Sequence, residues 1–180
     1  MPSSTVDDAD LDPLAELRAI YAAVDALTAG WSCDASTDCC RFAVTGREPY
    51  PTAVELAELD RAIAARGGLG RGGKRLLPIA AAERRCALLD PDGRCVVYAS
   101  RPFGCRTFYC ERAEGPFGER ELPRGEIAEL AGKIASLSAR FAPRDPGPRP
   151  LSRAELGLEN DRARGSHGRR KKGGRGPDRR

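Results

Sequence analysis

All seven cysteines of this 180-residue chain fall between positions 33 and 110. They occupy the least regular part of the sequence, between two amphipathic segments that read as helices. Buried cysteines that only fill a core would scatter with it, whereas metal ligands must converge on one point from several directions, which irregular backbone permits. All seven are therefore candidate metal ligands: Cys33, Cys39, Cys40, Cys86, Cys95, Cys105 and Cys110.

The single histidine, His167, lies in the polar C-terminal tail. Its position excludes from the folded body a Cys₂His₂ finger, a histidine-based catalytic zinc site and any Cys–His or Ser–His nucleophile pair. A site made of thiolates, or of thiolates and carboxylates, is left, and such sites select zinc, iron–sulfur clusters or Cu(I). We identify no catalytic machinery, and we expect a binding protein rather than a classical enzyme.

The hydrophobic pattern predicts an α+β fold, a small helix-rich domain with one short β-hairpin and a cysteine-lined metal site. Apolar residues at three- and four-residue steps predict helices over 13–29, 52–66 and 126–141. The first is capped by Asp12 and Pro13, and the second opens with a capping box from Thr52 to Glu55. Short strands over 86–90 and 94–98 flank the turn residues Pro91-Asp92-Gly93.

These elements divide the chain into three parts. Residues 1–12 are polar and predicted to be disordered, and residues 13–142 form the cysteine-cluster domain. Residues 143–180 are predicted to be a proline-rich linker, a short helix from Ser152 to Leu158, and a basic disordered tail. The glycine-rich stretch from Gly68 to Lys74 resembles a phosphate-binding loop, but no strand precedes it, so we interpret it as a plain loop.

Hairpin geometry constrains how the cysteines share a metal. In the predicted register Cys95 lies opposite Leu89, which is three residues or about 10 Å of strand from Cys86. Two thiolates on one zinc each lie ~2.3 Å from it, so Cys86 and Cys95 are not expected to share a mononuclear site unless the hairpin is irregular. The adjacent Cys39 and Cys40 are expected to point apart if their backbone is extended.

Three stretches are similar to the YkgJ-type cysteine-cluster family, also known as the CxxCxxCC or zinc- or iron-chelating domain. They are Cys33-Asp-Ala-Ser36-Thr-Asp-Cys39-Cys40, Cys86-Ala-Leu-Leu-Asp-Pro-Asp-Gly-Arg-Cys95-Val-Val-Tyr98 and Arg101-Pro-Phe-Gly-Cys105-Arg-Thr-Phe-Tyr-Cys110. The resemblance covers residues 30–112 and implies metal chelation, often by an iron–sulfur cluster, but no general reaction. The chain departs from the motif at Ser36, which stands where the family has a cysteine.

Three residues near the later cysteines have two interpretations each. Arg101 and Arg106 either lower thiol pKa values or donate hydrogen bonds to ligand sulfurs, or else form ordinary ion pairs. Tyr98 is interpreted as a core aromatic rather than a ligand.

Charge separates the tail from the body. Residues 159–180 hold nine Arg or Lys against three acidic residues, so the tail carries about six positive charges and the body about two negative ones. The chain has no apolar run of the ~18 residues needed to span a membrane and no secretory signal, so we predict a cytoplasmic protein. The strong preference for Arg over Lys indicates a GC-rich bacterial genome.

The leading functional hypothesis is a protein that holds zinc or an iron–sulfur centre, in electron transfer or metal handling, with a redox protein as a candidate partner. The alternative is a zinc-stapled interaction module that places its basic tail on nucleic acid, a partner that is not favoured because the tail lacks aromatic residues for base stacking. A thiol-based redox enzyme is a weaker third hypothesis, since the sequence holds no C-x-x-C dithiol.

Overall fold

A computed structural model describes residues 12–32, 37–69, 84–90, 92–109, 113–115, 121–153 and 156. The predictions for the N-terminus, the glycine-rich loop beyond Leu69 and the basic tail lie outside these residues, as do Cys33, Ser36 and Cys110. The described elements, in chain order, are α1 (Pro13–Leu27), η1 (Asp38–Cys40), α2 (Phe42–Thr45), α3 (Ala53–Ala65), η3 (Tyr98–Ser100), α5 (Phe103–Arg106), α6 (Arg124–Phe141) and η5 (Leu151–Arg153).

The long helices α1 and α3 begin at the capping signals of the sequence, and α6 begins at Arg124, two residues before its predicted start. The Asp12 carboxylate accepts a hydrogen bond from the Leu14 amide at 3.0 Å, with Pro13 in the first turn of α1. The predicted capping box opens α3, where Glu55 accepts hydrogen bonds from the amide and hydroxyl of Thr52 at 2.8 and 3.0 Å. The prediction of a helix-rich domain is confirmed.

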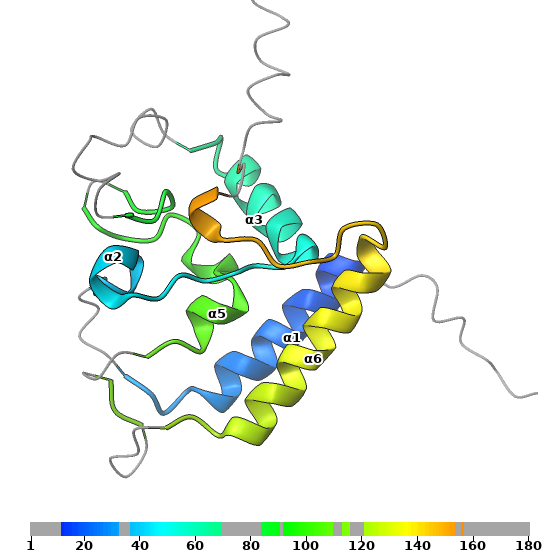
Figure 1. Ribbon diagram of the computed structural model, residues 1–180, viewed down its shortest axis with the longest axis horizontal. Helices are drawn as coiled ribbons and strands as arrows, with labels where there is room; N and C mark the ends of the chain where they lie inside the picture. The colour runs from blue at the N-terminus through cyan, green and yellow to red at the C-terminus, as the bar shows by residue number, and fades with distance from the viewer. Residues whose placement is uncertain are drawn as a thin grey trace, which may run out of the picture.

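Two hydrophobic clusters form the core, and α3 contributes to both. The first packs α1, α3 and α6 together and consists of Leu17, Ile20, Tyr21, Val54, Ile134 and Leu137. The second lies under the cysteine-bearing loops and consists of Phe42, Leu59, Ile63, Cys86, Leu88, Val97 and Leu151. Figure 1 shows α1 and α6 along one side of the molecule and the short helix α2 on the other, with α5 between α2 and α1. Through α3, the helical half supports the irregular half.

The predicted β-hairpin is reduced to a single antiparallel bridge between Leu89 and Cys95. The predicted register is therefore present, with the Val96 amide bonded to the Leu88 carbonyl at 2.8 Å. The flanking residues fold into turns instead of strands, because the Leu89 amide bonds back to the Cys86 carbonyl and residues 98–100 form η3. Gly93 adopts a φ of 80° in the turn, a conformation that glycine adopts without strain. No regular strand forms among the described residues.

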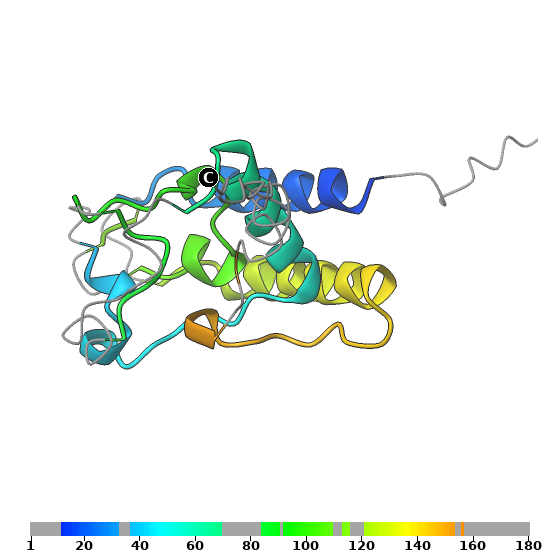
Figure 2. The same ribbon diagram turned by 90° about the horizontal axis from the view of Figure 1, so that it is seen from above.

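After α6 the chain doubles back across the molecule to η5, as the orange segment in Figure 2 shows. The Arg149 and Leu151 amides donate hydrogen bonds to the Pro51 and Pro49 carbonyls, each at 3.0 Å. The Leu151 side chain is only 3% exposed and packs in the second hydrophobic cluster. Residues for which the sequence predicts a linker thus pack on the body, which extends at least to Leu151.

None of the described helices has the length and apolar character needed to cross a membrane.

Candidate metal centre

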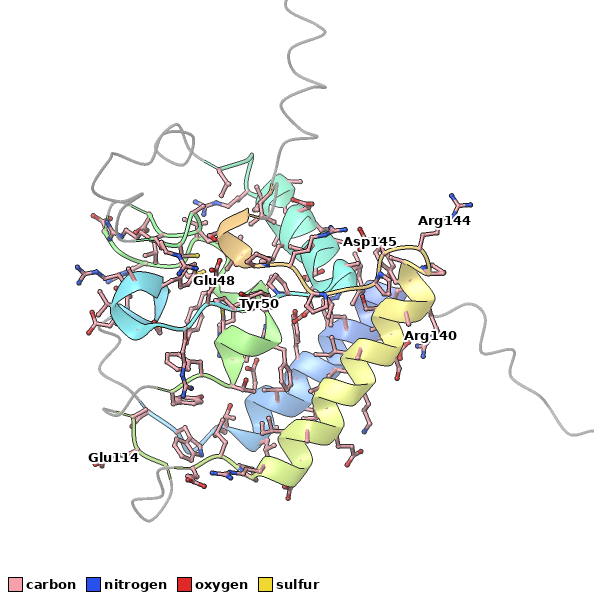
Figure 3. The ribbon with its side chains drawn as sticks, in the orientation of Figure 1. Glu48, Tyr50, Glu114, Arg140, Arg144 and Asp145 are labelled. Carbon is pink, nitrogen blue, oxygen red and sulfur yellow. The ribbon has the colours of Figure 1, made fainter. Side chains whose placement is uncertain are left out.

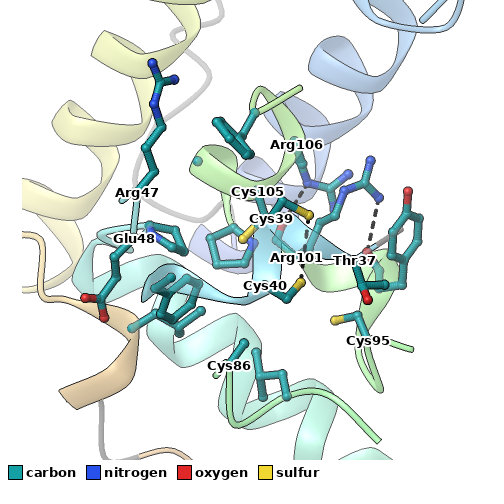
Figure 4. A pocket seen from close by; sticks show the side chains of 18 of the residues that line it. Thr37, Cys39, Cys40, Arg47, Glu48, Cys86, Cys95, Arg101, Cys105 and Arg106 are labelled. Carbon is teal, nitrogen blue, oxygen red and sulfur yellow. Dashed lines mark hydrogen bonds between the residues drawn. The ribbon is translucent and has the colours of Figure 1, made fainter. Parts of the chain in front are cut away.

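Five cysteines line one cavity of about 1240 Å³: Cys39, Cys40, Cys86, Cys95 and Cys105. They come from three segments, at residues 39–40, 86–95 and 105, and Figure 4 shows their sulfur atoms around a common space. None of the five forms a disulfide. The cavity also has apolar walls, to which Phe42, Leu88 and Leu151 contribute. The structure therefore brings five of the seven predicted ligands to one place.

The Cys39 and Cys40 sulfur atoms lie 3.9 Å apart. Both residues belong to η1, whose tight backbone turn replaces the extended conformation on which the sequence-based expectation depended. The condition under which the two side chains were expected to point apart, an extended backbone, is therefore not met. Two thiolates bound to one tetrahedral ion at ~2.3 Å would be separated by about 3.8 Å. The observed spacing therefore allows Cys39 and Cys40 to bind the same ion, although it does not require it.

Cys86 is attached to the η1 segment through the backbone. Its amide donates a hydrogen bond to the Cys40 carbonyl at 2.8 Å, and the Phe42 amide donates to the Arg84 carbonyl at 3.2 Å. These bonds flank an antiparallel bridge between Arg41 and Arg85. Two cysteine segments separated by more than forty residues thus share one short backbone ladder, which holds Cys40 and Cys86 side by side.

Cys95 lies beyond the turn that follows Cys86. A straight strand would place about 10 Å between Cys86 and Leu89 and so keep Cys86 and Cys95 from sharing one site. In the structure those residues form a turn, closed by the Leu89 amide on the Cys86 carbonyl at 3.3 Å. The hairpin is irregular, which is the condition under which that separation no longer applies.

Cys105 lies in the four-residue helix α5, and a buried carboxylate holds the start of that helix. Glu55, on α3, accepts hydrogen bonds from the Phe103 amide at 2.7 Å and from the Tyr21 hydroxyl at 3.1 Å. Its neighbour on the same face, Glu58, accepts from the Ser100 hydroxyl at 2.9 Å. The position of Cys105 is therefore fixed through α3 and α1.

Sequence reasoning found the capping role of Glu55 but not the burial of Glu55 and Glu58, which are 3% and 1% exposed. The only signal in the sequence is their spacing of three, which places both on the same side of α3 as Leu59. A pattern that assigns glutamates to the solvent side of a helix misses such residues, because their burial depends on partners elsewhere in the chain.

The thiols of the cavity differ in acidity. The hydrogen bond from the Cys40 thiol lowers the pKa of Cys39 to about 7, against the opposing effect of burial. The same bond, together with burial, raises the pKa of Cys40. Burial raises the pKa of Cys86 to about 12, and it also raises the pKa of Cys95 and of Cys105.

The thiols also affect one another. Negative charge on Cys86, Cys95 and Cys39 adds to the rise in the pKa of Cys105. Several thiolates are therefore costly in this cavity unless a cation compensates them, which is the condition that a bound metal satisfies.

The two arginines beside the later cysteines have different roles. Arg106 is 2% exposed, forms an ion pair with Asp25, donates to the carbonyls of Arg101 and Ala99, and lies 4.0 Å from the Tyr21 ring. Its guanidinium is thus committed to the fold. The ion-pair interpretation is confirmed for Arg106.

Arg101 lies over the ring of Tyr98 at 4.1 Å and contacts Asp25 at 3.4 Å. Its charge also lowers the pKa of Cys95, although burial keeps that pKa above its ordinary value. Arg101 therefore combines both predicted roles. Tyr98 is 63% exposed, so its assignment as a core aromatic is wrong.

Glu48, also in the cavity wall, joins its own segment to those of Arg84 and Ser152. Its carboxylate pairs with Arg84 and accepts a hydrogen bond from the Ser152 amide at 2.7 Å, beside the orange η5 segment in Figure 3. Burial raises the pKa of Glu48, but the bonds from Ser152 and Arg84 outweigh it and lower the pKa below its ordinary value. The C-terminal segment is thereby attached to the cavity wall.

The described side chains do not form a complete metal cage. Within the described ranges, no group of three Cys, His, Asp or Glu side chains has metal-binding geometry. Cys33 and Cys110 lie outside these ranges, although Ser32, which precedes Cys33, pairs with Glu114 at 3.1 and 3.2 Å. The fit to a thiophilic metal therefore rests on the donor type and on the shared cavity.

No protein-family model, curated protein or solved structure matches this chain. The YkgJ-type resemblance therefore stays a hypothesis that rests on the sequence motifs alone.

Proposed function

We propose that this protein binds zinc or an iron–sulfur centre through the cysteines of the cavity, and that the bound centre serves metal handling or electron transfer. The observation that carries the proposal is the gathering of five cysteines, from positions 39 to 105, on one cavity. Soft thiolate donors without histidine suit zinc and iron–sulfur centres.

The way the thiols are held supports the proposal. Three polypeptide segments are joined next to the cavity by the Cys40–Cys86 ladder, by the Leu89–Cys95 bridge and by the attachment of Phe103 to Glu55. Ligands of one centre need such positioning from several directions. Binding a cation would also relieve the mutual repulsion of the thiolates.

The test is metal content and an optical spectrum of full-length protein purified without oxygen. An iron–sulfur centre gives a brown protein with visible absorbance and matching iron and sulfide, whereas zinc gives a colourless protein with stoichiometric zinc. Cys86→Ser and Cys105→Ser variants should lose most of the metal. Thr28→Ala, which removes a buried hydroxyl bonded to the Val24 carbonyl on α1, should retain it.

A folded protein that contains no metal and whose thiols all titrate freely contradicts the proposal. Metal that survives both cysteine substitutions places the site elsewhere in the chain and contradicts it as well.

A further inference from the structure

The walls of the cysteine cavity carry more positive than negative side chains. Five arginines and two carboxylates line it among the described residues: Arg47, Arg84, Arg94, Arg101 and Arg106, with Glu48 and Asp92. Two of these arginines are neutralised, because Arg106 pairs with Asp25 and Arg84 pairs with Glu48. Arg101 shares Asp25 with Arg106. Asp25 thus leaves one positive charge shared by Arg101 and Arg106, and five arginines against Glu48, Asp92 and Asp25 leave an excess of two positive charges at the wall.

Arg47 and Arg94 are exposed, and neither forms an ion pair with a carboxylate in the described part of the chain. Arg47 lies against the Phe108 ring at 5.3 Å. Arg94 follows the turn at Gly93, and its amide bonds to Asp90 at 2.7 Å, which fixes its backbone. We call Arg47 and Arg94 the rim arginines. Each brings a charge that is not held in an ion pair to a wall that also carries thiols.

This charge bears on how a metal reaches the thiols. A cavity lined by one sign of charge raises the local concentration and the association rate of ligands of the opposite sign. A hydrated divalent cation is repelled by the rim arginines, whereas a metal ion wrapped in small carboxylates carries a net negative charge and is attracted. At 1240 Å³ the cavity exceeds the roughly 300–1,000 Å³ of ordinary small-molecule pockets, so it has room for such a complex.

We propose that the cavity takes up its metal from an anionic carboxylate chelate, such as a metal–citrate complex, rather than as the hydrated cation. This inference rests on the proposed function and specifies its substrate. The exchange involves no oxidation or reduction: metal–oxygen bonds to the carboxylates break, metal–sulfur bonds to the cysteines form, and the thiol protons pass to the released carboxylates or to buffer.

The experiment follows zinc uptake by full-length, reduced, metal-free protein, measured as proton release with a pH indicator in a stopped-flow instrument. Zinc is supplied either as its citrate complex or as the hydrated ion, at low salt and at 0.5 M salt. The test variant is R47Q/R94Q. The matched control is K133Q/R140Q, which removes two positive charges from α6, away from the cavity.

At low salt the test variant should load from zinc citrate at least fivefold more slowly than wild type, in keeping with the 10- to 1,000-fold scale of electrostatic steering. Its rate with hydrated zinc should stay constant or rise. The control should load like wild type from both zinc sources, because the charges it removes lie on α6, away from the cavity. The basic tail is unchanged in both variants. At 0.5 M salt the difference should vanish, because added salt shortens the screening length to a few ångströms (about 3 Å at 1 M).

Equal citrate rates for the test variant and wild type overturn the inference, and so does an equal loss of rate in the control variant. A wild-type protein that releases no protons with zinc from either source overturns this inference together with the zinc form of the proposed function, whereas the metal content and visible spectrum of protein purified without oxygen decide on the iron–sulfur form.

Discussion

The amide of Cys86 donates a hydrogen bond to the carbonyl oxygen of Cys40 at 2.8 Å. Because this bond joins backbone atoms, it fixes the two cysteine segments relative to each other whatever the state of the thiols. Cys40 is in turn the neighbour whose sulfur lies 3.9 Å from that of Cys39. Three thiols are thus linked by one backbone bond and one sulfur–sulfur contact, and the acidity of Cys39 depends directly on that contact.

Replacing Cys40 should change the pH dependence of Cys39. In the metal-free protein a Cys39 thiolate accepts a hydrogen bond from the neighbouring Cys40 thiol, which lowers the pKa of Cys39 to about 7. Since the thiolate is the nucleophile, alkylation of Cys39 should rise through pH 7 in the wild type. In Cys40→Ala the midpoint should move up towards the ordinary thiol value of about 8.5. The midpoint is measured by treating the protein with iodoacetamide at pH values between 5 and 10 and quantifying the alkylated Cys39 peptide by mass spectrometry.

Cys40→Ser is the matched control, because its hydroxyl can still donate to the Cys39 sulfur. Its midpoint should lie below that of Cys40→Ala. If both variants titrate like the wild type, the sulfur–sulfur contact does not control the acidity of Cys39.

Much of the helical half was predictable, because its signals are local. The caps at Asp12 and Thr52 and the apolar spacing in α1, α3 and α6 depend on residues within a few positions of one another. The register of Leu89 opposite Cys95 was predictable for the same reason, since a short turn sets it. Local sequence chemistry therefore determined the elements that support the cavity.

The details of the site were not predictable, because they depend on contacts between distant segments. Nothing near Glu58 in the sequence indicates that Ser100 and Arg18 will bind it, and so its burial was missed. The orientation of Cys39 and Cys40 required knowing that η1 is a helical turn. Leu151 was placed in a linker because four prolines precede it, although its side chain packs in a hydrophobic cluster.

Glu58 should make the stability of the fold depend on acid pH. Burial raises the pKa of Glu58, but hydrogen bonds from Arg61 and Ser100 outweigh it and lower the pKa below its ordinary value. The unfolded state, with an ordinary carboxyl pKa of about 4.3, then binds more protons than the folded state. The stabilisation from Glu58 is therefore complete above the unfolded pKa and is lost as the pH falls through the folded pKa.

Glu58→Gln tests this by urea unfolding at pH 6 and pH 3. The variant should be less stable than wild type by about 1.5–3 kcal/mol at pH 6, since it loses charge-assisted hydrogen bonds. The difference in unfolding free energy between the variant and wild type should be smaller at pH 3, where Glu58 of the wild type is closer to being protonated. Glu129→Gln, which changes an exposed pair with Lys133 on α6, should show little change at either pH. A gap for Glu58→Gln that stays constant with pH contradicts the assignment.

Arg106 should matter for stability more than Arg101. Arg106→Lys keeps the charge but loses the planar fork that reaches Asp25 and the carbonyls of Arg101 and Ala99. We expect a loss of roughly 1.5–3 kcal/mol, because the hydrogen bonds of this buried, charged guanidinium are lost. Arg101→Lys, at a side chain that is 17% exposed and 3.4 Å from Asp25, should cost less. Denaturant unfolding of the two metal-free variants makes the comparison, and equal losses contradict it.

The close approach of Gly115 to Trp31 offers the sharpest test of packing at the edge of the cysteine region. A Cβ atom at position 115 would lie 2.5 Å from the Trp31 ring, so Gly115→Ala must displace the indole. We expect a loss of about 1–3 kcal/mol, the usual cost of overpacking. Trp31 is the only tryptophan of the chain, so its fluorescence should shift in the folded variant.

Gly132→Ala, on α6, is the matched control, because a Cβ atom at position 132 would have no neighbouring atom within 4 Å. It should raise stability by up to about 1 kcal/mol through helix propensity and leave the fluorescence unchanged. A Gly115→Ala protein with wild-type fluorescence and stability would show that Trp31 does not pack on Gly115.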